Sequence, residues 1–170
     1  ESRGRGDVYK RQMKKRDGGA DLDETAEYVA ALRDHIGHAF TVSDLRHLYR
    51  GGRLSRGAAI VGQAIKLNPI HMVDENGALE HIGNVMGRKC AIRTLLAKME
   101  RETAGYVNDA VIVAHGDCIG DAEYLKEKVE ERFPGQRVIV TDVGPIIGSH
   151  CGKGMLALLY LAANKTDRKM

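Results

Sequence analysis

Residues 144–154 combine the residue types that build binding loops. The stretch Gly-Pro-Ile-Ile-Gly-Ser-His-Cys-Gly-Lys-Gly places four glycines, a proline, Ser149 and His150 between two apolar runs. Glycine lets the backbone take positive φ and lets a ligand come close, while proline fixes one φ. Because a β-branched run precedes the stretch, we expect a shaped loop at the end of a strand, where open α/β sheets bind ligands. The alternative is a plain turn whose histidine bonds to backbone.

A second cluster, Arg-Gly-Gly-Arg-Leu-Ser at residues 50–55, puts two arginines around a Gly-Gly turn. Guanidinium groups beside a helix N-terminus suit a carboxylate or a phosphate. The alternative is a helix that ends at Gly51-Gly52 with solvated arginines.

Three other kinds of chemistry fit poorly. Residues 148–153 are not a phosphate loop, since four residues instead of five separate glycine from lysine and Gly154 replaces the Ser or Thr. His115 and Cys118, with the adjacent pair at 150–151, lack the paired spacing of a zinc site. Adjacent residues on extended backbone point to opposite faces, so the histidine of that pair does not activate its cysteine. We therefore predict no metal site and no catalytic residue.

The composition suits one soluble domain. The 170 residues are 43% hydrophobic and 29% charged, without an apolar run of the roughly 20 residues that span a membrane. Three cysteines at unrelated spacings suit a reducing compartment. We expect a cytoplasmic protein.

The positive charge lies at one end of the chain. The net charge is +3, but residues 1–16 hold seven basic and two acidic residues, which leaves nineteen basic and twenty-one acidic residues elsewhere. A basic folded surface for nucleic acid is therefore not predicted. We expect residues 1–16 to be a disordered tail that is partly foreign to the natural protein.

The rest of the chain predicts an α/β fold, a mixed β-sheet packed with helices. Residues 17–39 form an amphipathic helix, with apolar residues at three- and four-residue steps from Leu22 to Ile36. Residues 40–165 form the main domain, and 166–170 a second tail. In the main domain we expect helices capped by Ser43 and Ser55, a hairpin at Asn76-Gly77, and further helices over 88–102 and 121–133. We expect strands over 40–42, 110–115, 137–143 and 155–161. The strands at 110–115 and 137–143 are predicted to be parallel neighbours.

Taken in order, these motifs resemble the C-terminal portion of the DegV family over roughly residues 20–163. The resemblance rests on Phe-x-Val-x-Asp-Leu-x-x-Leu-x-x-Gly-Gly-Arg-Leu-Ser at 40–55, Leu-Asn-Pro-Ile at 67–70, and Gly-Pro-x-Ile-Gly-Ser-His-x-Gly-x-Gly at 144–154. Gly77 and the strand that ends at His115 add to it. It implies the C-terminal domain of a DegV-like two-domain protein.

The resemblance also implies a function. Such proteins bind a long-chain fatty acid in an apolar tunnel, like the binding subunit of bacterial fatty acid kinase, and present its carboxyl group to the catalytic subunit of that kinase. They are not catalysts and need no cofactor, and they have peripheral membrane contact when they exchange lipid. By position, Ser149 and His150, with Gly148 and Gly152, match the loop near the acyl carboxyl, and Arg53 matches the arginine of the Gly-Gly-Arg turn. Apolar and small residues that suit a tunnel wall are Ala59, Gly62, Leu67, Ile70, Met155 and Leu156.

Two departures from the family pattern shape the expectations. Lys153 replaces the usual proline of the loop, and the family's N-terminal domain is absent, so we expect an exposed apolar interdomain face that promotes self-association. Two alternatives stay open. One is an enzyme or binding module for a small carboxylated or phosphorylated metabolite that uses Arg53 and His150, and the other is a fragment without activity.

Overall fold

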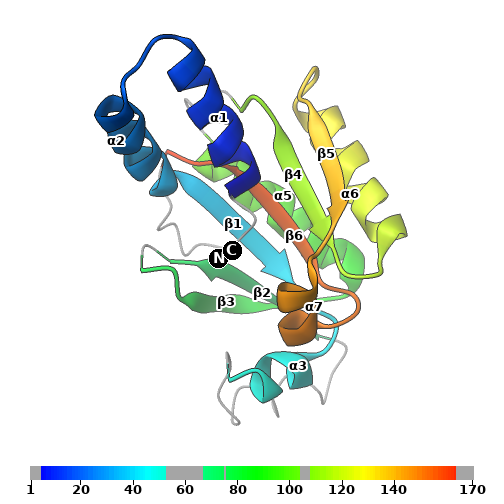
Figure 1. Ribbon diagram of the computed structural model, residues 1–170. Coiled ribbons are helices and arrows are strands. Elements are labelled where there is room, and N and C mark those ends of the chain that lie inside the picture. The colour runs from blue at the N-terminus through cyan, green and yellow to red at the C-terminus, as the bar shows by residue number, and fades with distance from the viewer. Residues whose placement is uncertain (1–4, 53–66, 75, 104–107, 164–170) are drawn as a thin grey trace.

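The computed structural model describes residues 5–52, 67–74, 76–103 and 108–163. Six strands form one mixed sheet in the order β3-β2-β1-β6-β4-β5 (Figure 1). Among these strands β4 and β5 are parallel neighbours, and the other neighbours are antiparallel. The predicted α/β fold with a mixed sheet is confirmed. The strands are β1 (Ile36–Thr41), β2 (Leu67–Val73), β3 (Leu79–Met86), β4 (Val111–His115), β5 (Val138–Asp142) and β6 (Leu156–Leu161).

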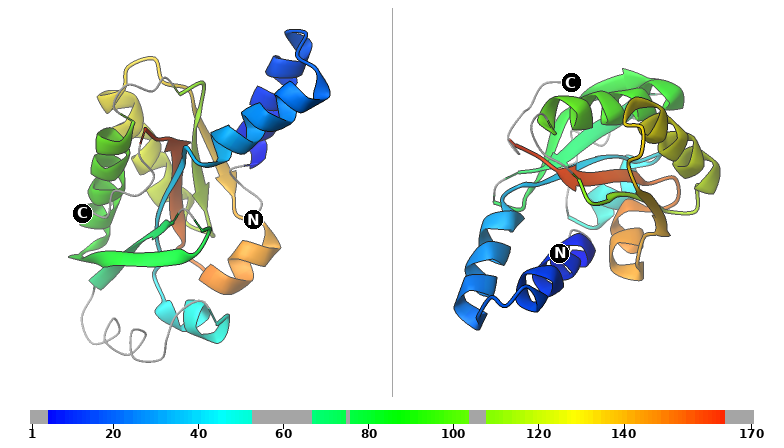
Figure 2. Two further views of the ribbon diagram at one scale, coloured as in Figure 1. Left: turned by 90° about the vertical axis from the view of Figure 1, so that its left-hand side faces the viewer. Right: turned by 90° about the horizontal axis from the view of Figure 1, so that it is seen from above.

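Helices lie on both sides of the sheet. Helices α5 (Arg88–Glu102) and α6 (Ile119–Arg132) cover one face, while α1 (Arg5–Asp17), α2 (Leu22–Arg33) and α7 (Pro145–Cys151) lie on the other side (Figure 2). The short helix α3 (Leu45–Arg50) packs beside α7. Within the described residues, no helix has the length and apolar character needed to cross a membrane.

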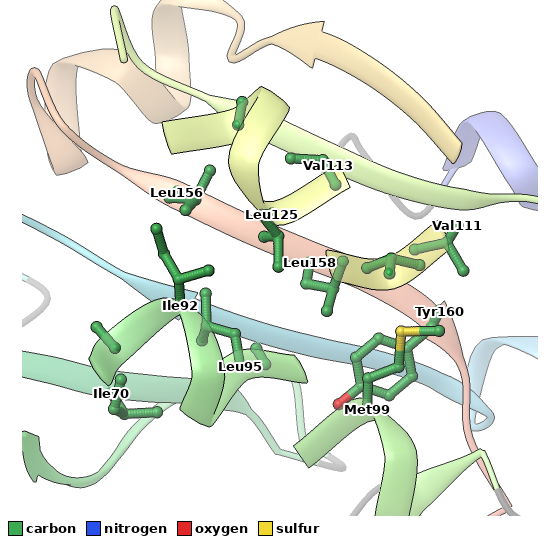
Figure 3. Packing of buried hydrophobic residues seen from close by; sticks show 14 of the residues in the cluster. Ile70, Ile92, Leu95, Met99, Val111, Val113, Leu125, Leu156, Leu158 and Tyr160 are labelled. Atoms are coloured by element: carbon green, nitrogen blue, oxygen red, sulfur yellow. The ribbon is translucent and has the colours of Figure 1, made fainter. Parts of the chain in front are cut away.

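The main core lies between the sheet and α5 and α6. Its side chains interdigitate from both helices and the central strands (Figure 3). Leu95 of α5, Leu125 of α6 and Leu158 of β6 are completely buried there. Because α5 has its apolar residues at three- and four-residue steps, one stripe of the helix faces the sheet, as the sequence predicts.

The predicted hairpin is also present. Strands β2 and β3 pair in antiparallel register, and Gly77 in their connection has φ of +81°. The Asp74 carboxylate accepts hydrogen bonds from the backbone N–H groups of Asn76, at 2.9 Å, and Ala78, at 2.7 Å. These bonds fix the turn and with it the register of the two strands.

The prediction of a disordered tail at residues 1–16 is wrong for residues 5–16, the part of it that the structure describes. Residues 5–17 form α1, which turns back at Gly18-Gly19 and packs along α2. Lys14 and Arg11 reach Asp109, with N···O distances of 3.1 Å and 3.7 Å. Because the tail contains good helix formers and finds an acidic partner far along the chain, its charge does not keep it unfolded.

The predicted helix over residues 17–39 is too long, and the sheet begins earlier than residue 40. Helix α2 ends at Arg33, and β1 starts at Ile36 because it pairs along its whole length with β6. At Gly37 an added Cβ would overlap the ring of Tyr160 on β6, so this glycine leaves room for the ring. The predicted tail 166–170 lies outside the described residues.

The helix cap predicted at Ser43 lies one residue later. Asp44 is the N-cap of α3, and its carboxylate accepts a hydrogen bond from the backbone N–H of Arg46 at 2.8 Å. Ser43 instead donates its hydroxyl to the carbonyl of Gly154 at 3.3 Å. The predicted end of this helix at Gly51-Gly52 is confirmed, since Gly52 has φ of +70°. The cap predicted at Ser55 lies outside the described residues.

Candidate functional site

The two glycine-containing clusters meet at one edge of the sheet. At this edge β4 and β5 end, β1 ends and β6 begins, because Leu156 pairs with both Thr41 and His115 while His115 pairs with Asp142. The turn at Gly51-Gly52 follows α3, and residues 144–154 connect β5 to β6. The carboxyl edge of the parallel strands therefore carries residues 144–154 and the Gly51-Gly52 turn, in the position where ligands bind to α/β sheets.

Residues 144–154 differ from the predicted shaped loop, because most of them form α7. Pro145 is its first residue, where the missing N–H costs nothing, and Gly144 is the N-cap. Gly152 ends the helix with φ of +72°, a conformation that favours glycine. The proline and the glycines of the motif thus begin and end a two-turn helix that carries Ser149 and His150.

Helices α3 and α7 are joined by a reciprocal packing of histidines on glycines. The imidazole of His150, on α7, lies so close to Gly51 that a Cβ there would overlap ring atom Nδ1. In the same way His47, on α3, packs against Gly152, where an added Cβ would lie 2.5 Å from ring atom Cδ2. Each helix therefore places a histidine on the C-terminal glycine of the other, and this fixes the position of both rings.

The other predicted loop residues have different surroundings. Ser149 is exposed, and its hydroxyl donates to the carbonyl of Ile146 at 2.8 Å, within its own helix. A Cβ at Gly148 would make only an ordinary contact with Val143, so packing does not demand glycine there. Both lie on the same two-turn helix as His150.

An apolar cluster supports α3 and α7 from beneath. It joins Leu45 and Leu48 of α3, Cys151 of α7 and side chains of the strands on this face of the sheet. Small residues at Ala114 and Ala157 lie in the middle of this face, beside Phe40 and Leu159. The site therefore combines polar groups on short helices with an apolar floor.

Those of the expected tunnel residues that the structure describes do not line one common surface. Met155 belongs to the cluster beneath α7, but Ile70 and Leu156 are fully buried on the opposite face, in the core with α5 (Figure 3). Leu67 is half-buried at the start of β2, opposite Met86. The expectations for Arg53, Ala59 and Gly62 lie outside the described residues.

Two ion pairs lie on the segments that carry the site. Arg46 forms an ion pair with Asp44 at 2.6 Å, and this contact lowers the pKa of the Asp44 carboxyl. Lys153, the residue that departs from the family pattern, bonds to Asp117 at 2.6 Å and lowers the pKa of that carboxyl. Both pairs are solvent-exposed on at least one side, so each contributes little to stability.

The histidine and cysteine considered for zinc, His115 and Cys118, lie at the end of β4 and at the N-cap of α6. The Cys118 thiol donates to the carbonyl of Met155 at 3.2 Å, and its burial raises the pKa of the thiol. His115 Nδ1 lies 3.5 Å from a carboxylate oxygen of Asp142. Among the described residues no group of three or more His, Cys, Asp or Glu side chains is arranged to hold a metal ion.

Two residues at this edge were missed by the sequence analysis. His47 lies one helical turn before Gly51, on the same face of α3, but no motif marks it. Arg88 begins α5 and donates a hydrogen bond to the carbonyl of Gly154 at 2.8 Å. A basic residue at a helix start carries no sequence signal for such a long-range contact.

Comparison with known proteins agrees with the motifs. The family described as "Uncharacterised protein, DegV family COG1307" matches residues 10–163. A DegV domain-containing protein of Clostridium perfringens is 35% identical over 157 residues, which cover 92% of this chain and 53% of that protein. A similar protein of Streptococcus pyogenes is 36% identical over 149 residues, covering 88% of this chain and 51% of its own. The chain spans about half the length of these relatives.

Solved structures share the fold. The fatty acid binding DegV family protein of Streptococcus agalactiae superposes with a TM-score of 0.82 at 25% identity, covering 94% of this chain and 56% of that one. The Streptococcus pneumoniae Fatty Acid Kinase (Fak) B3 protein loaded with linoleic acid gives a TM-score of 0.81 at 19% identity, covering 91% and 54%. From the family match and the shared motifs, the chain belongs to the DegV family.

Proposed function

We propose that this chain contributes to the binding of a long-chain fatty acid, with the acyl carboxyl group at the edge formed by α3 and α7. The observation that carries the proposal is the packing of His150 on Gly51, which brings the histidine of one motif onto the Gly-Gly turn of the other. A neutral or charged imidazole is a suitable donor to a carboxylate, and the nearby Ser149 hydroxyl becomes one when it leaves its bond to the Ile146 carbonyl. The similar Streptococcus agalactiae protein, which binds fatty acid, supports this choice of ligand.

The acyl chain is proposed to lie against the apolar floor beneath α7. This revises the predicted tunnel wall, because Ile70 and Leu156 face α5 while Met155 faces the short helices. Ala157 and Ala114 have small side chains beside Phe40 and Leu159. All four are buried in this structure, so an acyl chain takes this place only by displacing the side chains that cover them. Contacts of this kind suit a methylene chain, which gains about 0.8 kcal/mol per buried CH₂.

The proposal includes a role for the whole protein. We infer that the bound carboxyl group is presented to a separate kinase, as the family resemblance implies, and that this chain does not itself catalyse the transfer. A neighbour with the same fold is named for fatty acid kinase, which agrees with that role. Turnover of an acyl phosphate by the isolated chain would contradict it and favour the enzyme of small metabolites.

The test is native mass spectrometry of the chain purified from bacterial cells, followed by denaturing extraction of bound lipid. We expect a co-purified long-chain fatty acid that is lost or strongly reduced in His150→Ala. The matched control is His35→Ala, because His35 lies at the other end of the sheet and bonds to the carbonyl of Ala162 at 3.0 Å. Equal lipid occupancy in both variants would contradict the placement of the carboxyl group at α7.

A further inference from the structure

Arg88 connects three elements at the edge that carries the site. Its Nε donates to the carboxylate of Asp121, on α6, at 2.9 Å, and its Nη2 donates to the carbonyl of Gly154, in the turn between α7 and β6, at 2.8 Å. Nη2 also lies 3.6 Å from the sulfur of Cys118. Because Asp121 holds the guanidinium from one side, the group reaches the turn in a fixed orientation.

The Gly154 turn depends on several such bonds. Gly154 has φ of +83°, and its N–H donates to the carbonyl of Gly116 at 2.6 Å. Its own carbonyl accepts from Arg88 and from the hydroxyl of Ser43. A hydrogen bond from a charged group is about twice as strong as one between neutral groups, so the bond from Arg88 is the strongest on this carbonyl.

The position of His150 depends on this turn. Helix α7 has only seven residues, and a helix of two turns has little stability of its own. Its N-terminal end follows β5 directly, where the N–H of Val143 donates to the carbonyl of His115 at 2.7 Å. Its C-terminal end leads into the turn at Gly154, so a shift of that turn moves the last turn of α7, which carries His150.

We propose that Arg88 is a positioning residue for His150, which it holds on Gly51 through the Gly154 turn. The inference rests on the proposed function in one respect, since it matters for ligand binding only if His150 contacts the acyl carboxyl group. The positioning itself does not depend on any ligand. The proposal gives the first residue of α5 a role in a site whose helices, α3 and α7, lie on the other side of the sheet.

The first test uses the free chain and the ring NMR signals of His150, assigned with His150→Gln. In Arg88→Ala we expect these signals to shift and broaden, while those of His35, at the far end of the sheet, stay unchanged. Arg88→Lys restores them in part, because an ammonium group can donate to the Gly154 carbonyl but lacks the fork that also holds Asp121. The control is Arg93→Ala, an exposed arginine of the same helix. Identical His150 signals in Arg88→Ala and Arg93→Ala would overturn the proposal.

The second test is the affinity for a fluorescent long-chain fatty acid. We expect Arg88→Ala to weaken binding about tenfold, Arg88→Lys less, and Arg93→Ala not at all. Suppose that the parent chain and all variants fail to bind the probe although the His150 signals shift in Arg88→Ala. In that case the proposed function fails and the positioning role stands. If the probe binds equally to the parent and to Arg88→Ala although the His150 signals shift, the proposed contact of His150 with the carboxyl group fails. If the signals do not shift either, the positioning role fails.

A third variant covers the case in which Arg88→Ala does not fold. Asp121→Asn keeps the arginine and removes the charge that orients it. We expect the same direction of change in the His150 signals and in probe affinity, with a smaller size, and unchanged signals in a folded Asp121→Asn would overturn the proposal as well.

Discussion

His71, on β2, is a buried histidine that its surroundings keep neutral. Only 2% of its surface is exposed; its ring stacks on Phe40 with 5.1 Å between centroids and meets the edge of His81 at 5.2 Å. Burial first, and then the charge of His81, lower the pKa of His71 from 6.5 to about 4. Its Nε2 has no hydrogen-bond partner among the described residues, which costs about 1–3 kcal/mol.

The lowered pKa predicts that acid destabilises the chain through His71. Between pH 6.5 and about 4 the unfolded chain binds a proton at this ring and the folded chain does not, so the free energy of unfolding falls as pH falls. The contribution of His71 is fully present above pH 6.5 and drops by about 2 kcal/mol at pH 5. Urea denaturation at pH 7 and pH 5 measures this loss. In His71→Phe, which keeps a ring against Phe40, this part of the loss should vanish, and an unchanged loss would contradict the prediction.

Substitution by alanine should affect ligand binding at Gly51 and stability at the neighbouring Gly52. At Gly51 φ is −75°, which alanine accepts, but the new Cβ displaces the His150 ring. At Gly52 φ is +70°, which strains alanine, but nothing lies within 4 Å of the new Cβ. Gly51→Ala should therefore weaken fatty-acid binding about tenfold with little change in stability. Gly52→Ala should cost about 1 kcal/mol of stability with little change in binding.

Lipid-binding titrations and urea denaturation of both variants measure the two effects separately. If Gly51→Ala binds the fluorescent fatty acid as tightly as the parent chain does, the ring of His150 is not part of the ligand site. Equal stability losses in the two variants would show that the backbone at Gly51 matters more than the ring.

Among the helices and strands, the predictions that the structure confirms are those that rest on a sequence pattern within the element itself. Helix α5 and the β2–β3 hairpin follow from signals within the segment itself, an apolar stripe in one and Asn76-Gly77 in the other. Strand β1 could not be separated from α2 in this way, because Ile36 continues the helical period and becomes a strand residue only through its pairing with Leu161. Tertiary pairing overrode the local period.

The residues of the candidate site also divide into those that a local sequence pattern predicts and those that it does not. The sequence could point to the motif at 144–154 and to the Gly51-Gly52 turn, since glycine, proline and histidine gather there. It could not show that the first motif folds as α7, or that His47 and Arg88 contribute, because their partners lie far along the chain. Met155 and Leu156, adjacent in sequence, belong to the clusters on opposite faces of the sheet, because successive side chains alternate where the chain enters β6.

A buried polar cluster joins the last turn of α5 to β6. Lys98 and Glu102 form an ion pair at 2.7 Å with side chains only 1% exposed, and the Tyr160 hydroxyl donates to the same carboxylate. Lys98→Met or Glu102→Gln alone should lower the free energy of unfolding by about 3 kcal/mol, since each removes one partner of a buried ion pair and leaves the other charge in place. The double variant should lose much less than the sum, because its buried groups are neutral and Tyr160 keeps an acceptor. Denaturant titrations measure this, and additive losses would contradict the pairing.

At the scale of the whole molecule, the two faces of the sheet are covered differently. Helices α5 and α6 bury one face along most of its length, whereas the short helices α3 and α7 cover the other at one edge. These two helices also expose apolar side chains, Tyr49 at 40% and Ile146 at 72%. Exposed apolar side chains that lie together mark surfaces suited to contact with other protein.

Exposed apolar groups on α3 and α7 predict concentration-dependent self-association of the chain. A symmetric dimer through this edge would bury two copies of Ile146, each worth up to about 2 kcal/mol, so Ile146→Glu should weaken association by tenfold or more. Leu22→Glu is the matched control, because Leu22 is even more exposed, at 84%, but lies at the start of α2. Sedimentation equilibrium over a range of concentrations measures both variants. If the two changes weaken association equally, the contact between the two copies lies elsewhere. If added fatty acid dissociates the parent chain, lipid and the second copy compete for the edge where His150 lies.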